Sequence, residues 1–141
     1  MEVGGSLILT GTDFIDNRAS NTAGALFSLN AVTLTNGSFI NNWAGGYAGA
    51  LEGGYPLVIT NSRFDGNTAG TSAGAISTYG AATIAGTEFM NNRANGDGAG
   101  ALMAGGDTVI RNSAFLSNTA ASYGGAIDGQ GLLSVSDSTF R

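Results

Sequence analysis

The chain contains 141 residues, a length that suits one domain. It has 24 glycines, one proline and no cysteine or histidine, which excludes Cys–His zinc sites, histidine general bases and thiol nucleophiles. Ten acidic residues against five arginines give a formal net charge of −5, so the basic face that nucleic-acid binding needs is missing. No apolar run approaches the ~20 residues of a membrane-spanning helix, so direct membrane insertion is not expected.

The predicted elements begin with a short strand at residues 7–10, Leu-Ile-Leu-Thr, in which apolar side chains alternate with period two. Gly11 then marks a corner, because glycine tolerates left-handed backbone. A second strand carries Phe14 inward, the segment up to Ala19 turns, and a third strand carries Leu26 inward. Three short strands therefore make one predicted coil of about 25 residues.

The same elements recur along the whole chain with an almost constant period. A phenylalanine column has steps of 25, 25, 25, 26 and 25 residues: Phe14, Phe39, Phe64, Phe89, Phe115 and Phe140. An asparagine follows three residues after each of the first five: Asn17, Asn42, Asn67, Asn92 and Asn118. The coils are expected at 5–29, 30–54, 55–79, 80–105 and 106–130, with a partial coil at 131–141, all within a single domain, 1–141. The one extra residue lies between Asn92 and Gly100 and is predicted to be a loop insertion.

A fixed period in this range predicts a solenoid. Helical repeats are excluded, because each repeat is rich in Gly, Asn, Thr and Ser and lacks apolar spacing of three and four. The fold class is therefore all-β, a parallel β-helix (β-solenoid) of about five coils. Coils stacked ~4.8 Å apart place like residues in register, so the phenylalanines should stack. Each asparagine amide should bond the backbone of its own coil and the amide of the next coil, which would form a ladder.

Two motifs recur together in the coils. One is FxxN, as at residues 115–118; the other is GGA followed by an aliphatic residue at 124–127, relaxed to Ala-Gly-Ala in the four preceding coils. The pair resembles the repeats of the chlamydial polymorphic outer membrane protein family. The resemblance implies a right-handed β-helix of the autotransporter-passenger type, secreted or displayed at the bacterial surface and commonly adhesive. Because passengers of that family are much longer, the chain is expected to be a segment of a larger protein or a minimal stand-alone version.

No group of residues forms a convincing catalytic, cofactor or metal site. Glu52 and Asp128 share a predicted column but lie three coils apart, about 14 Å, beyond the roughly 5–10 Å of paired glycosidase carboxylates. Arg63 and Glu88 occupy one outward column in adjacent coils and predict a surface ion pair. Residues 95–98 carry oxygen ligands but lack the acidic spacing of calcium loops, so they predict a glycine-rich turn. The sequence thus predicts no enzyme and no cofactor.

Two sets of side chains are candidates for surface contacts. The position after each phenylalanine should point outward, and it is apolar in four coils: Ile15, Ile40, Met90 and Leu116. Exposed apolar stripes often mark contacts with another protein, whereas a crossing loop or a bulge would cover them; both interpretations stay open. Trp43, with Arg18 one coil away, and Tyr47 are candidates for glycan contacts.

These observations predict a non-enzymatic structural or adhesive rod, outside a bacterial cell or on its surface, whose partner is a host or cell-surface protein or glycan. The alternative is a self-assembling solenoid, because open strand edges at both ends can pair with another copy and stack head-to-tail into filaments. A carbohydrate-binding or carbohydrate-active β-helix is the third possibility.

Overall fold

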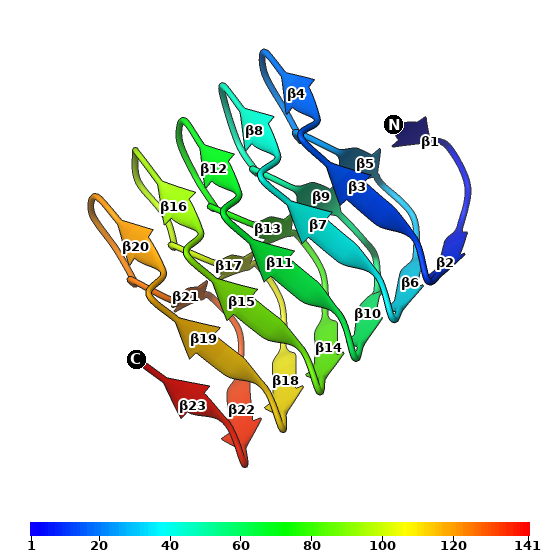
Figure 1. Cartoon of the computed structure of the whole chain (residues 1–141). Helices are drawn as coiled ribbons and strands as arrows, with labels where there is room; N and C mark the ends of the chain where they lie inside the picture. The colour runs from blue at the N-terminus through cyan, green and yellow to red at the C-terminus, as the bar shows by residue number, and fades with distance from the viewer.

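The computed structural model describes residues 1–141, which form 23 parallel strands and no helix. Figure 1 shows the strands stacked coil upon coil from the N-terminus to the C-terminus. The all-β parallel solenoid predicted from the repeat is confirmed. No helical segment long and apolar enough to span a membrane is present.

Three sheets of six strands correspond to the three predicted strands of each coil. Sheet A consists of β1 (Glu2–Val3), β5 (Leu26–Ser28), β9 (Leu51–Gly53), β13 (Ile76–Thr78), β17 (Leu102–Ala104) and β21 (Ile127–Gly129). Sheet B consists of β2 (Leu7–Thr10), β6 (Val32–Thr35), β10 (Leu57–Thr60), β14 (Ala82–Ala85), β18 (Thr108–Arg111) and β22 (Leu133–Ser136). Sheet C consists of β3 (Asp13–Ile15), β7 (Ser38–Ile40), β11 (Arg63–Asp65), β15 (Glu88–Met90), β19 (Ala114–Leu116) and β23 (Thr139–Phe140).

A fourth sheet, sheet D, adds to the three-strand coil expected from the sequence. It consists of β4 (Arg18–Ala19), β8 (Trp43–Ala44), β12 (Thr68–Ala69), β16 (Arg93–Ala94) and β20 (Thr119–Ala120). The segment after the asparagine was expected to turn, but two of its residues run extended, and the backbones of adjacent coils pair there. The Trp43 N–H, for example, donates to the Asn17 carbonyl at 2.9 Å.

Each coil turns through two corners of left-handed backbone. The first lies between sheets B and C, where φ is near +50° to +60° at Gly11, Asn36, Asn61, Gly86, Asn112 and Asp137. The second lies between sheets C and D and is occupied by Asp16, Asn41, Gly66, Asn91 and Ser117. Asparagine, aspartate and glycine are the residue types that adopt this conformation most easily, which explains their place in the repeat.

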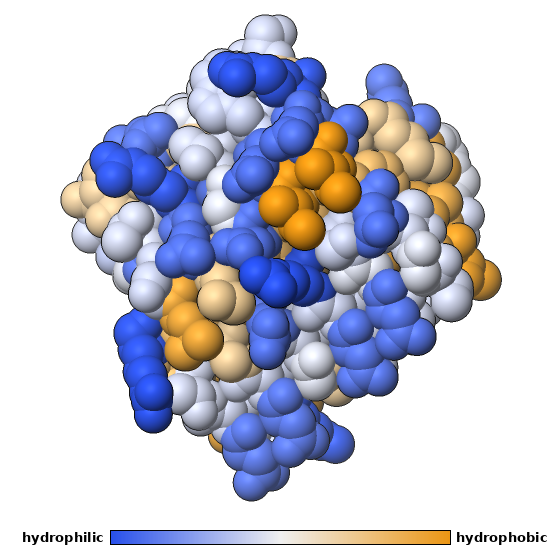
Figure 2. All heavy atoms as spheres, viewed as in Figure 1, coloured by the Kyte–Doolittle hydropathy of each residue, from blue (hydrophilic) through white to orange (hydrophobic).

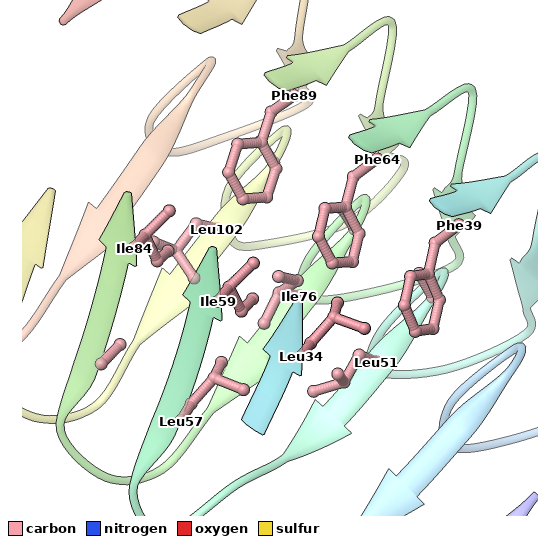
Figure 3. Close-up of a cluster of buried hydrophobic side chains, with 14 of the residues drawn as sticks. Leu34, Phe39, Leu51, Leu57, Ile59, Phe64, Ile76, Ile84, Phe89 and Leu102 are labelled. Atoms are coloured by element: carbon pink, nitrogen blue, oxygen red, sulfur yellow. The ribbon is translucent and has the colours of Figure 1, made fainter. Parts of the chain in front are cut away.

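The core consists of columns of apolar side chains in register. Phenylalanine rings of adjacent coils stack with centroids 4.6–5.0 Å apart and nearly parallel planes. In Figure 3 the rings of Phe39, Phe64 and Phe89 lie one behind the next, facing leucine and isoleucine side chains of sheets A and B. Each fully buried side chain of this size stabilises the fold by about 1.5–3 kcal/mol.

The asparagine column is a continuous hydrogen-bonded ladder beside the core. The Asn67 side chain is fully buried, and its Nδ2 donates to Asn92 Oδ1 and to the Phe39 carbonyl, each at 2.9 Å. Its backbone N–H donates to the same Oδ1 at 3.0 Å. Asn42 and Asn92 repeat this arrangement. The carbonyl that each buried amide bonds belongs to the preceding coil and not to its own coil as expected, so each amide is satisfied by atoms of the two neighbouring coils.

Candidate functional site

The side chains that follow each phenylalanine point outward from sheet C and form a column that is apolar in four coils. Its member in the first coil is exposed to solvent. Ile15, Ile40, Asp65, Met90 and Leu116 are ladder neighbours on adjacent strands. The Ile15 side chain is 53% exposed, and the other members are half-buried. Figure 2 shows apolar atoms over the ends of β3 and β7 and again over β15 and β19, with hydrophilic atoms between them.

A polar cluster divides this apolar column. Arg63 Nη2 forms an ion pair with Asp65 Oδ2 at 2.7 Å, and Asn91 Nδ2 donates to Asp65 Oδ1 at 3.1 Å. The expected ion pair between Arg63 and Glu88 is therefore wrong: the two are ladder neighbours, but Asp65 on the same strand lies closer to the guanidinium. Burial opposes ionisation of Asp65, but the bonds from Arg63 and Asn91 and the arginine charge outweigh it, so the pKa of Asp65 is lowered.

Trp43 lies on sheet D, at the next corner of the coil. The Arg18 guanidinium carbon lies 4.8 Å from the Trp43 ring centroid, within the range of a cation–π contact. The Trp43 ring is half-buried, and a Cβ at Gly45 would lie 3.3 Å from its edge. One face of this indole is thus occupied by a side chain of the preceding coil, which leaves less of it for a ligand.

A groove of about 460 Å³ runs across the loops that follow sheet D. Its walls are the side chains of Asn21, Tyr47, Thr71, Ser72 and Asp97, and its remaining residues are Gly45, Gly46 and Gly96. These residues come from four successive coils. Tyr47 is a candidate contact residue from the sequence, and the structure places it in this groove.

The one-residue insertion in the fourth coil supplies one end of the groove. Asp97 accepts a hydrogen bond from Ser122 Oγ of the next coil at 2.7 Å. Gly98 beside it has φ of +138°, and a Cβ there would meet the Ser72 carbonyl oxygen. No group of three or more His, Cys, Asp or Glu side chains is arranged to hold a metal ion.

A buried acid on sheet A is the feature that sequence reasoning missed. Glu52 lies in one column with Asp128, as expected, yet it is only 2% exposed. The Tyr79 hydroxyl donates to Glu52 Oε1, while Glu52 Oε2 and the neighbouring Ser77 Oγ have no hydrogen-bond partner. The Tyr79 ring stacks on Tyr55 with centroids 6.0 Å apart. The outward column is therefore closed over by aromatic side chains from the loop after the strand, which alternation alone does not reveal.

Burial controls the ionisation of this pair. Loss of hydration raises the pKa of Glu52, and the bond from Tyr79 only partly offsets that rise. Burial also raises the pKa of Tyr79, and its hydrogen bond to Glu52 raises it further. The tyrosine therefore stays protonated and acts as the donor. The ladder neighbours of Glu52 are Phe27 and Ser77, so no second carboxylate lies next to it in the column. Asp128, the other acid of the column, is three coils further along, beyond Ser77 and Met103.

Comparison with known proteins gives one family match. No curated protein and no solved structure matches the chain. The match covers residues 112–130, which contain the FxxN motif of the fifth coil and its Gly-Gly-Ala-Ile segment. These residues match the family model of the Chlamydia polymorphic membrane protein repeat, which confirms the resemblance stated from the sequence.

Proposed function

We propose that the chain is a non-enzymatic structural and adhesive segment of a bacterial surface or secreted protein. The repeat match and the β-solenoid fold support a surface or secreted repeat protein. The columns of stacked residues form a rod in which every coil is bonded to the next, an arrangement suited to holding a contact face away from a cell. A catalytic role has no support from the acids, because Glu52 is bonded to Tyr79 and has no carboxylate beside it in its column.

The proposed adhesive role rests on the apolar column of sheet C. Ile15 is more than half exposed on a regular sheet face, and Ile40 lies beside it in the ladder. Neighbouring exposed apolar side chains on a rigid face are typical of protein–protein contacts. The Arg63–Asp65 pair within the column adds charged groups that a protein partner can complement.

The test measures binding of the labelled chain to intact cultured epithelial cells. Ile40→Asp places a charge in the apolar column, and Thr83→Asp places the same charge at an exposed position of sheet B as a matched control. We expect the unsubstituted chain to bind saturably, and trypsin treatment of the cells to remove this binding. Ile40→Asp should bind at least tenfold more weakly than the unsubstituted chain, and Thr83→Asp should bind as it does. Absence of saturable binding, or equal binding by both variants, overturns the adhesive role.

Self-assembly is the second candidate, and the end coils favour it. Every residue of β22 is exposed and Phe140 is 45% exposed, while Leu9 and Phe14 of the first coil are half-buried members of the same columns. A further coil can therefore extend the ladders at either end, from the same chain or from a second copy. Sedimentation over a wide concentration range tests this: a concentration-dependent rise in mass above 14.0 kDa supports stacking, and a constant mass refutes it.

A further inference from the structure

We propose that the groove across the loops after sheet D binds a neutral, linear oligosaccharide. The groove is defined by Asn21, Tyr47, Thr71, Ser72 and Asp97 with Gly45, Gly46 and Gly96. None of its lining residues belongs to the apolar column of sheet C, so this proposal can be tested separately from the adhesive role. Four features of the groove support it: its hydrogen-bonding groups, its tyrosine, its charge and its length.

The polar side chains in the groove have hydrogen-bonding capacity that the fold does not use. The side chains of Asn21 and Tyr47 make no hydrogen bond within the chain, and Thr71 Oγ1 reaches only Ser72 Oγ, at 3.5 Å. An amide and three hydroxyls can each donate and accept. Sugar hydroxyls also do both, so a sugar can satisfy these groups, whereas an apolar ligand would leave them unpaired.

Tyr47 provides the apolar contact that a sugar ring needs. Its side chain is 47% exposed and is the one aromatic group in the groove. A tyrosine combines an apolar ring with a polar tip, so it can pack against the C–H face of a sugar while its hydroxyl bonds to a ring substituent. Gly46, which precedes this tyrosine and also lines the groove, carries no side chain, and a Cβ there would lie 2.3 Å from the Asn21 carbonyl oxygen.

The charge of the groove selects a neutral ligand. Asp97 is its one ionisable acid or base besides the Tyr47 phenol, and no arginine lines it. A chain of net charge −5 with a carboxylate in the site repels uronic acids and sulfated sugars. Asp97 Oδ1 already accepts a hydrogen bond from Ser122 Oγ, and its Oδ2 remains to accept one from a sugar hydroxyl. The inserted residue of the fourth coil, which the fold does not require, carries this carboxylate into the groove.

The length of the groove fits a short oligosaccharide rather than a single sugar. Its residues come from four coils, so it spans three coil steps, or roughly 14 Å at ~4.8 Å per step. It lies along the axis of the rod and is open to solvent at its top. A linear chain of two or three sugars can therefore lie in it and contact Asn21, Tyr47 and Asp97 together.

The experiment measures binding of defined trisaccharides to the chain by calorimetry and by saturation-transfer NMR. The neutral probes are cellotriose, chitotriose and mannotriose, and the anionic probe is trigalacturonate. We expect at least one neutral trisaccharide to bind, and trigalacturonate to bind at least tenfold more weakly. Tyr47→Ala should weaken binding at least tenfold, and Asp97→Asn should weaken it several-fold.

Tyr123→Ala is the matched control, since Tyr123 is an exposed tyrosine on the equivalent loop of the fifth coil, outside the groove. It should leave trisaccharide binding unchanged, and denaturant unfolding of all three variants verifies that they are folded. Three results overturn the proposal: no binding of any neutral trisaccharide, equal effects of Tyr47→Ala and Tyr123→Ala, or tighter binding of trigalacturonate. The Ile40→Asp variant should bind the trisaccharide normally, so failure of the groove and failure of the sheet C contact are distinguishable.

Discussion

Replacing Phe64 by alanine is the sharpest test of the stacked core. Phe64 is fully buried, and its ring centroid lies 4.9 Å from that of Phe39 and 5.0 Å from that of Phe89. Truncation of a buried phenylalanine costs about 3–5 kcal/mol. Two stacking contacts, each about 0.5–1.5 kcal/mol, contribute to this cost. The backbone of β11 is bonded to β7 and β15, so the coils cannot close the cavity, and we expect the upper part of the range.

The assay is equilibrium unfolding in guanidinium chloride, followed by circular dichroism. Phe140→Ala is the matched control, because Phe140 is 45% exposed and stacks on only one ring, that of Phe115. Its loss should cost about 1–2 kcal/mol. A cost below about 1 kcal/mol for Phe64→Ala, or equal costs for the two variants, would refute the argument that the phenylalanine column holds the coils together.

Two further predictions concern buried polar groups. Asn67→Leu should lower the free energy of unfolding by at least about 3 kcal/mol, because two N–H donors of Asn42 lose Asn67 Oδ1 as their acceptor. An unchanged melting temperature would contradict the hydrogen-bonded ladder. For Glu52, the raised pKa means that the folded chain keeps its proton to higher pH than the unfolded chain, whose carboxyl titrates near 4.5. The free energy of unfolding should therefore fall as pH rises from about 4.5 through the folded pKa, and Glu52→Gln should abolish this fall. If the difference in unfolding free energy between the wild-type chain and Glu52→Gln does not vary from pH 4 to pH 8, the acid is not buried in solution.

The columns could be predicted from the sequence because a solenoid repeats its constraints in every coil. A residue that faces the core at Phe14 faces it again at Phe39, so six occurrences report on one environment. The first corner was predicted for the same reason: Gly11 and Asn36 share a backbone that few residue types tolerate. Sheet D was not predicted, because its strands are two residues long and show no alternation that could be seen in the sequence.

The burial of Glu52 and the shape of the groove could not be predicted, because both depend on loops that meet across coils. Alternation correctly points Glu52 outward, but Tyr79, 27 residues later in the chain, reaches back and bonds it. Tyr47 and Asp97 are 50 residues apart in sequence and lie in one groove because the coils are stacked. The inserted residue in the fourth coil was a visible signal, yet it identifies a loop and not the residues that this loop meets.

A site limited to a few coils has to come from residues that depart from the repeat, because a strict repeat makes all coils equivalent. Tyr47, Glu52 and Asp97 are such departures: none belongs to the phenylalanine or asparagine column. Substitution of a column residue should change the free energy of unfolding, because each column residue contacts its neighbours in the coils above and below. Tyr47 and Asp97 lie outside the buried apolar core, so Tyr47→Ala should change binding with little effect on unfolding, whereas Phe64→Ala should change unfolding. In this fold, binding specificity can thus vary from coil to coil while the backbone stays the same.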